Sequence, residues 1–117
     1  MGRGHRLTQG KRIAQLLHEG QGWTNRVLVL RVLPSGLETS RVGFLVGKRL
    51  GKAVVRNRIR RRLREVARLT SIKVGWDLVI IARQGAPAAS YHRLRMALLD
   101  LLQRAQLLDF DGEEASV

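Results

Sequence analysis

The stretch that decides the fold is RVGFLVGKRLGKAVVRNRIRRRLRE, residues 41–65. Residues 41–46, an arginine followed by VGFLV, are typical of a β-strand. Beyond it, apolar residues recur at helical spacing and fall within one arc of about 120° on a helical wheel. These residues are Val55, Ile59, Leu63, Val66 and Leu69. The stretch therefore predicts a strand followed by an amphipathic helix of about 17 residues.

The outer surface of this helix is almost wholly cationic. Between Lys48 and Arg68 the chain has ten basic residues and a single acid, Glu65. Arginines stand at successive i, i+4 positions, where like charges cost a few tenths of a kcal/mol per pair. Arg62 falls within the apolar arc and must extend to solvent or meet a partner. Bound phosphates would offset the repulsion, so the helix predicts contact with nucleic acid.

The junction between strand and helix is also basic. Gly51 permits a tight entry into the helix. The amino end of a helix attracts phosphate, and Lys48, Arg49 and Lys52 would reinforce that attraction. The spacing does not match a P-loop, GxxxxGK[ST]. Alternatively, Gly47 and Gly51 serve only as turn residues.

Upstream, Thr8 is a candidate cap for a short helix that Gly20 would end. Its apolar stripe consists of Ile13, Leu16 and Leu17. Residues 27–33 are rich in Val and Leu and lead into a Pro-Ser-Gly turn, so a hairpin with residues 41–46 is predicted.

Downstream, residues 78–82 form a continuous apolar run that is typical of a central strand covered on both faces. Ser90 is a candidate cap for a last helix. Its apolar positions are Leu94, Leu98, Leu101, Leu102, Ala105 and Leu108. The resulting order of helix, two strands, helix, strand and helix indicates an α/β or α+β fold. Trp23 is interpreted as partial core, with stacking on RNA as the alternative, and Trp76 as core.

Composition limits the function classes. The 117 residues include 22 Lys and Arg against 9 Asp and Glu, for a net charge of +13. A polyanion is the simplest compensation, so nucleic acid is the leading partner and an anionic membrane surface the second. We find no apolar window of membrane-spanning length, no secretory signal and no cysteine, and we expect a cytoplasmic protein with no membrane association.

Protein-based catalysis finds no support in the sequence. His5, His18 and His92 lie in separate elements without metal-ligand spacing. Ser35, Ser40 and Ser90 have no accompanying His and Asp, and paired catalytic carboxylates are absent. Asp77 and Asp100 are isolated. We therefore predict no catalytic residue and no metal ligand in the protein.

Residues 41–65 resemble the signature of the bacterial ribonuclease P protein subunit. That family has an RVG strand, a basic K-K/R-x-G-x-A-V junction and a helix that begins R-N-R-x-K/R-R-x-x-R-E. Here these parts are RVG at 41–43, KRLGKAV at 48–54 and RNRIRRRLRE at 56–65. The flanking order of elements also agrees from about Arg6 to Leu108.

The resemblance implies a fold and a function. The fold would be an α/β (α+β) sandwich, ribosomal-protein-S5-domain-2-like, with a mixed four-stranded sheet, three helices and a left-handed βαβ crossover. The protein would bind the catalytic RNA of an endoribonuclease and the 5′ leader of precursor tRNA, and assist removal of that leader. Chemistry would belong to the RNA and its Mg²⁺ ions, and no obligate protein partner is inferred.

The resemblance also implies the site residues. The surface facing the catalytic RNA would comprise Lys48, Arg49, Lys52, Arg56, Asn57, Arg58, Arg60, Arg61, Arg64 and Arg68. A cleft between the first helix and the sheet would hold the leader through Ile13, Leu17, Leu28 and Arg31. Family members often place aromatic residues there for base stacking. This chain offers aliphatic contact and an arginine that can stack on a base.

We expect one domain over residues 1–108, with residues 1–6 as a mobile basic arm and residues 109–117 as a disordered acidic tail. Three other functions compete with the leading one. The chain could be a ribosomal or other general RNA-binding protein. It could be a membrane-surface protein, which the lack of Trp or Phe on the apolar helix face disfavours. The missing ligand clusters disfavour a metal-dependent hydrolase.

Overall fold

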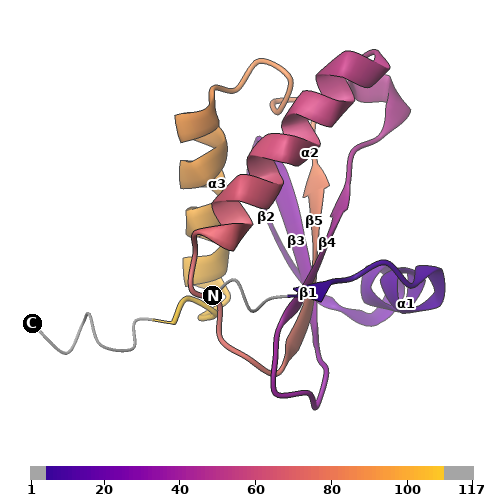
Figure 1. Cartoon of the computed structure of the whole chain (residues 1–117), viewed down its shortest axis with the longest axis vertical. Coiled ribbons are helices and arrows are strands. Elements are labelled where there is room, and N and C mark those ends of the chain that lie inside the picture. Colours follow the sequence, from indigo (N-terminus) through magenta and orange to yellow (C-terminus); the bar gives the residue numbers. More distant parts are fainter. Residues whose placement is uncertain (1–4, 110–117) are drawn as a thin grey trace, which may run out of the picture.

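The computed structural model describes residues 5–109. Its elements are β1 (His5–Arg6), α1 (Gly10–Glu19), β2 (Gln21–Thr24), β3 (Leu28–Pro34), β4 (Arg41–Leu45), the 3-10 helix η1 (Lys48–Leu50), α2 (Ala53–Arg68), β5 (Trp76–Ala82) and α3 (Tyr91–Arg104). The strands form one mixed sheet in the order β1-β4-β5-β3-β2. Helices α2 and α3 cover one face of the sheet and α1 lies on the other (Figure 1). The predicted fold class is confirmed, with the two-residue β1 added at the edge of the four longer strands.

Strand β5 is the centre of the sheet, as its apolar run predicts. Residues Leu78, Val79 and Ile80 are fully buried, because both faces of the strand are covered. β5 pairs in parallel with β4 and antiparallel with β3. A strand this apolar is stable only between two neighbours and under two layers.

The predicted hairpin of residues 27–33 with residues 41–46 is wrong. β5 lies between β3 and β4, so these two strands do not pair with each other. The true partner of β3 in a hairpin is β2, which begins with Gln21 opposite Val32. The sequence of β2, QGWT, gives no alternating apolar pattern, because Trp23 is its one partly buried residue and the other three are exposed. Trp23 packs at the margin of the core, as predicted, whereas Trp76, predicted as core, is only partly buried there.

The connection from β4 through α2 to β5 is a left-handed crossover between adjacent parallel strands. In Figure 1, β4 lies in front of β5, both strands run upward, and α2 descends on the left of the sheet. Parallel strand–helix–strand units are almost always right-handed. The hand expected from the family resemblance is therefore confirmed, whereas general packing rules predict the opposite.

The main hydrophobic core lies between the sheet and α2 with α3. Ile59, Leu63 and Val66 are buried as predicted, but Leu69 is 62% exposed. α2 ends at Arg68, and Leu69 is its C-cap, so its side chain leaves the apolar face. Ala67 is buried instead.

The caps of the flanking helices agree only in part with the sequence. Ser90 caps α3, and its Oγ accepts a hydrogen bond of 3.1 Å from the backbone N–H of Arg93. Gly20 ends α1 as predicted, but the N-cap is Gln9 rather than Thr8 and makes no side-chain cap bond. Helix α1 buries Leu16 against Val79 in a second, smaller cluster. The apolar cluster that attaches α1 to the sheet is therefore smaller than the core beneath α2 and α3.

The predicted basic arm over residues 1–6 is wrong at its last two residues. His5 and Arg6 pair in parallel with β4, and Leu7 behind them is 3% exposed. At the other end, the backbone N–H of Asp109 donates to the carbonyl of Ser71 at 2.9 Å, so the predicted tail does not start at residue 109. The rest of both segments, 1–4 and 110–117, lies outside the described residues. In residues 5–109 no helix is long and apolar enough to cross a membrane.

Candidate nucleic-acid interface

The outer face of α2 carries three arginines that no acid of the described chain neutralises: Arg60, Arg61 and Arg64. Arg61 and Arg64 are exposed. Arg60 is half-buried, and its Nη1 donates a hydrogen bond of 3.0 Å to Asn57 Oδ1. This amide orients one guanidinium without cancelling its charge. These three cations form what we call the α2 arginine face.

Strand β1 adds a cation to this face. Partial desolvation lowers the pKa of Arg64 below its ordinary value, and the positive charges of Arg6 and Arg60 lower it further. Arg6 is far from Arg64 in the sequence, and only the pairing of β1 with β4 brings it near α2. The crowding is electrostatically unfavourable in the free protein, and a bound polyanion would relieve it.

Two arginines on the flank of α2 make hydrogen bonds within the protein to the segment before α3. Arg58 Nη2 donates to the carbonyl of Pro87 at 3.3 Å, and Arg62 Nη1 donates to the carbonyl of Ala89 at 3.2 Å. Both contacts tie α2 to the segment before α3. Arg62 thus meets a partner, as predicted. Arg58 has this structural contact, and its role in RNA binding stays a prediction.

The arginine ladder is interrupted at Arg68. Its guanidinium makes two hydrogen bonds to Glu65, at 2.8 and 3.2 Å, and the hydrogen bond lowers the pKa of Glu65. The helix's single acid therefore compensates the last arginine of the predicted site. We exclude Arg68 from the α2 arginine face for this reason.

The basic junction lies at the amino end of α2. Lys48, Arg49 and Lys52 are all exposed. Gly51 has a φ of 141°, and a Cβ there would lie 3.1 Å from the Val55 side chain, so this position requires glycine. Arg56 Nε donates to the Gly51 carbonyl at 3.1 Å and braces the turn.

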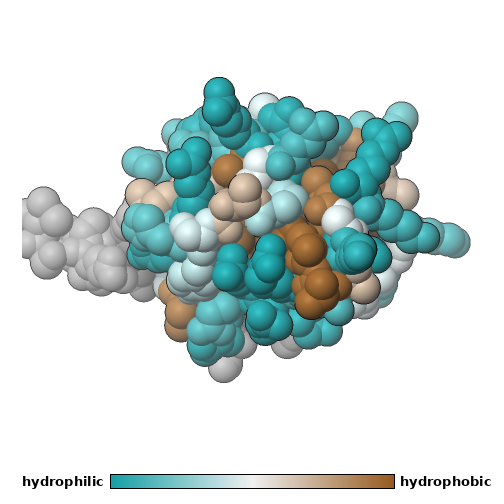
Figure 2. Space-filling view, turned by 90° about the horizontal axis from the view of Figure 1, so that it is seen from above, coloured by the Kyte–Doolittle hydropathy of each residue, from teal (hydrophilic) through white to brown (hydrophobic). Residues whose placement is uncertain are grey.

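A hollow of about 660 Å³ separates this junction from the end of β5. Ile81 and Arg83 line it on the β5 side, and Lys48 and Arg49 line it on the junction side. Figure 2 looks onto this end of the molecule, where hydrophilic side chains surround a small group of hydrophobic ones. The junction therefore presents cations around a concave surface, which suits a phosphate backbone.

The predicted leader cleft is only partly assembled. Leu17 on α1 is 36% exposed and Ile13 packs against the small cluster beside Val79. The prediction that Leu28 lines the cleft is wrong, because Leu28 is fully buried in the main core on the opposite face of the sheet. Residues 28 and 31 differ by an odd number, so their side chains point to opposite faces of β3. Val29, half-buried, is the residue that shares the α1 face with Arg31.

Arg31 is committed to α1. Its guanidinium donates to the backbone carbonyls of Leu17 and Gly20, which are among the last carbonyls of the helix. A cation at this end satisfies the orphan carbonyls and complements the helix dipole. Arg31 therefore positions α1 over the sheet as well as facing the predicted cleft.

A buried carboxylate forms the other attachment of α1. Asp77, 0% exposed, accepts hydrogen bonds of 2.7 Å from Arg12 of α1 and from Arg41 of β4. Burial raises the pKa of Asp77, but the hydrogen bonds and charges of Arg41 and Arg12 outweigh burial and hold it below its ordinary value. We call this group the Asp77 clamp. In the sequence Asp77 looks isolated, because its partners are 65 and 36 residues away.

The described residues contain no group of three or more His, Asp or Glu side chains that would hold a metal ion. What the geometry defines is a small α+β protein with an unneutralised arginine face, the architecture of an RNA-binding protein.

Comparisons with known proteins agree with this class. The family model for ribonuclease P matches residues 1–106. The ribonuclease P protein component of Dehalococcoides mccartyi strain CBDB1 is 40% identical over 116 residues, which cover 99% of this chain and 97% of that protein. The corresponding protein of Roseiflexus castenholzii is 44% identical over 108 residues, 90% of this chain and 88% of that protein.

Solved structures give the same result. The Staphylococcus aureus ribonuclease P protein superimposes with a TM-score of 0.81 at 27% identity, over 90% of this chain and 98% of that one. The Thermotoga maritima protein in complex with 1-(4-fluorophenyl)-2-thiourea gives 0.79 at 31% identity, over 85% and 98%. The chain belongs to the ribonuclease P protein family. It is a protein component of that endoribonuclease, with the ribonuclease P RNA as its partner and tRNA 5′ maturation as its role.

Proposed function

We propose that the α2 arginine face and the basic junction bind the ribonuclease P RNA, and that precursor tRNA contacts the α1 face through its 5′ leader. The observation that carries the first part is the set of cations that have no acidic partner among residues 5–109. Six of them are exposed or half-buried around one end and one side of α2: Lys48, Arg49, Lys52, Arg60, Arg61 and Arg64. Phosphates of a folded RNA would supply the missing negative charge.

In this proposal Mg²⁺ is held by the RNA subunit and supplies the chemistry of phosphodiester hydrolysis. The protein contributes fixed positive charge, which reduces the repulsion between phosphates that Mg²⁺ must otherwise screen. We also infer a cytoplasmic location, where precursor tRNA is processed.

A reconstitution assay tests the function. Cleavage of precursor tRNA by the cognate RNA subunit is measured over a Mg²⁺ titration, with and without the protein. We expect the protein to lower the Mg²⁺ concentration at half-maximal rate several-fold. A titration curve that the protein does not move would contradict the proposal.

Binding to the RNA subunit should depend steeply on salt. Six phosphate contacts predict a slope of about −4 to −5 in a plot of log K against log salt concentration. The measurement is a series of filter-binding titrations between low and physiological salt. A slope near zero would show that binding does not rest on phosphate neutralisation.

The α1 face presents apolar side chains to the proposed leader. Leu17 is 36% exposed, and Val29 and Ile81 are half-buried on the same side of the sheet. Such side chains give bases apolar contact, but they lack the stacking energy of aromatic rings. We therefore place the leader across α1 and the neighbouring part of the sheet.

Leu17→Asp is expected to weaken binding of leader-containing precursor tRNA by the holoenzyme about tenfold. The change removes apolar contact worth about 1 kcal/mol and adds a charge that repels phosphate. Affinities are measured for precursors with and without a leader. Leu37→Asp, at a similarly exposed leucine between β3 and β4 (44% exposed), is the control. An equal loss for the leaderless substrate would place Leu17 outside the leader site.

A further inference from the structure

A second cationic surface lies between the β2–β3 turn and α3, away from the α2 arginine face. It forms a groove of about 440 Å³. Its lining residues are Asn25, Arg26, Val27, His92, Arg93, Met96, Ala97 and Asp100. We call it the α3 groove.

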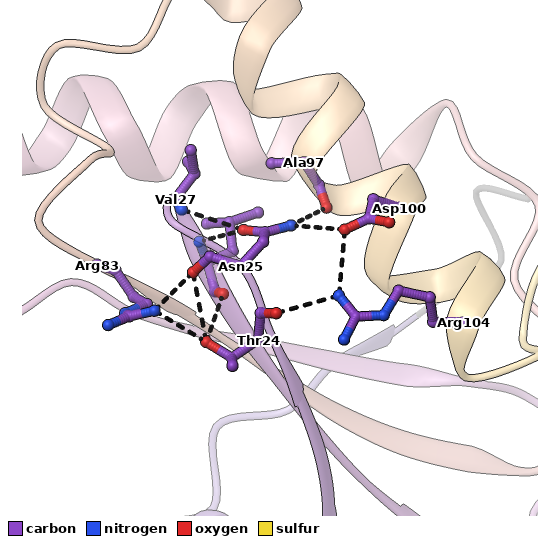
Figure 3. Close-up of polar contacts among 8 residues, drawn as sticks. Thr24, Asn25, Val27, Arg83, Ala97, Asp100 and Arg104 are labelled. Carbon is purple, nitrogen blue, oxygen red and sulfur yellow. Dashed lines mark hydrogen bonds and ion pairs between the residues drawn. The ribbon is translucent and has the colours of Figure 1, made fainter.

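A network of hydrogen bonds centred on Asn25 makes the wall of this groove rigid (Figure 3). The Asn25 Oδ1 accepts from the backbone N–H groups of Val27 and Leu28, at 3.1 and 2.9 Å. Its Nδ2 donates to the Ala97 carbonyl and to Asp100 Oδ2, both at 3.0 Å. One side chain therefore shapes the turn and fastens it to α3, and its hydrogen-bonding capacity is fully used.

The same network includes the one acid that lines the groove, Asp100, and two nearby arginines, Arg83 and Arg104. Asp100 also accepts from Arg104 at 3.3 Å, and Arg104 donates to the Thr24 carbonyl at 3.1 Å. Arg83 donates to Thr24 Oγ1 and to the Asn25 carbonyl, at 3.1 and 2.7 Å. Figure 3 shows these bonds converging on the turn from both sides. Asp100 Oδ2 thus has its two partners, Asn25 and Arg104, inside the network, and no bond from Asp100 to Arg26 or Arg93 is present.

Two arginines of the groove are left without a partner. The side chains of Arg26, in the turn, and Arg93, in the first turn of α3, are exposed, and no acid of residues 5–109 bonds either of them. Met96, 49% exposed, lies beside them as an apolar surface. Two free guanidinium groups across a rigid groove suit a phosphate, and an adjacent thioether suits a ribose or a base.

We propose that the α3 groove is a second contact for the ribonuclease P RNA, in which Arg26 and Arg93 hold one backbone phosphate. This inference rests on the proposed function. α2 and α3 cover the same face of the sheet (Figure 1), so one folded RNA can lie across both helices. The α1 face, where we place the leader, lies on the other side of the sheet, and this favours the RNA subunit over the precursor tRNA.

The double variant Arg26→Gln/Arg93→Gln tests the proposal. Its affinity for the RNA subunit is expected to fall about tenfold, because each lost exposed ion pair is worth up to about 1 kcal/mol. The salt slope is expected to become shallower by about 1 to 2. Neither side chain makes a hydrogen bond or ion pair within residues 5–109, so the thermal unfolding midpoint should not change. Lys73→Gln, which removes one exposed charge outside the groove, is the control for net charge and is compared with each single variant, Arg26→Gln and Arg93→Gln.

Three outcomes separate the possible failures. If the double variant binds the RNA subunit as tightly as the wild type, while an α2 variant loses affinity, the α3 groove proposal is overturned and the proposed function stands. If only the affinity of the holoenzyme for precursor tRNA falls, the groove serves the substrate and our assignment to the RNA subunit is wrong. If the wild-type protein itself does not bind the RNA subunit, the proposed function fails first.

Discussion

Replacing Arg60, Arg61 and Arg64 together with glutamine is expected to lower the affinity for the ribonuclease P RNA about 100-fold. Each arginine is free to make a charge-assisted hydrogen bond to phosphate, worth about 1 kcal/mol net at an exposed site. Three such losses correspond to about 3 kcal/mol, or two orders of magnitude. The salt slope should become shallower by two to three, because fewer counterions are released.

The fold of this triple variant should survive. None of the three side chains belongs to the core, and within the described part of the chain their one bonded partner is Asn57, which accepts from Arg60. Arg60 and Arg64 repel each other at i, i+4, so their removal relieves a few tenths of a kcal/mol of strain in the free helix. We expect the thermal unfolding midpoint to stay level or to rise slightly.

Filter binding to the RNA subunit, with circular dichroism for the fold, measures both effects. Lys73→Gln controls for loss of one charge elsewhere and should be compared with each single arginine variant. Arg62→Gln is a second control, because Arg62 bonds the Ala89 carbonyl and its loss should affect stability rather than affinity. Binding of the triple variant within twofold of the wild type would mean that the α2 arginine face is not the interface.

Asp77→Asn should cause the largest loss of stability among these variants, about 2 to 3 kcal/mol at pH 7. Removing one partner of a buried ion pair usually costs 3 to 5 kcal/mol. Here the arginines retain some access to water, with Arg12 20% and Arg41 23% exposed, which reduces the cost. The loss should be concentrated in α1, since the Asp77 clamp and Arg31 are its main polar attachments.

The effect of Asp77 should also depend on pH in a defined direction. Its pKa in the folded protein lies below the value of about 3.9 in the unfolded chain. The stabilisation is therefore complete above about pH 4 and is lost as the pH falls through the folded-state pKa. The difference in unfolding free energy between wild type and Asp77→Asn should shrink over that acidic range.

Urea denaturation at pH 7 and at lower pH measures these differences. Glu65→Gln, which breaks the exposed pair with Arg68, is the matched control and should cost much less. Hydrogen exchange should show α1 opening more readily in Asp77→Asn than β5. Equal stability of Asp77→Asn and Glu65→Gln would show that the clamp contributes little.

Much of the site could be predicted because it lies on one continuous stretch. Ile59, Leu63 and Val66 repeat at helical spacing, so the buried face of α2 is encoded locally, and the arginines then fall outward. The run from Leu78 to Ala82 is apolar on both faces, which identifies a central strand. Leu28 was misplaced although the alternation of β3 already puts it opposite Arg31.

The order of amino acids therefore determines local features of this protein. These are the segments that become helices or strands, the side that each of them buries, and the excess of positive charge along α2. The three-dimensional fold alone decides that β5 lies between β3 and β4 and that Arg12 and Arg41 meet at Asp77. It also brings the charge of Arg6 near Arg64 and places Arg26 and Arg93 in one groove. Periodicity reports the surroundings of a residue within its own element. Pairings between distant segments depend on how whole layers pack, and a single sequence carries no periodic signal for them.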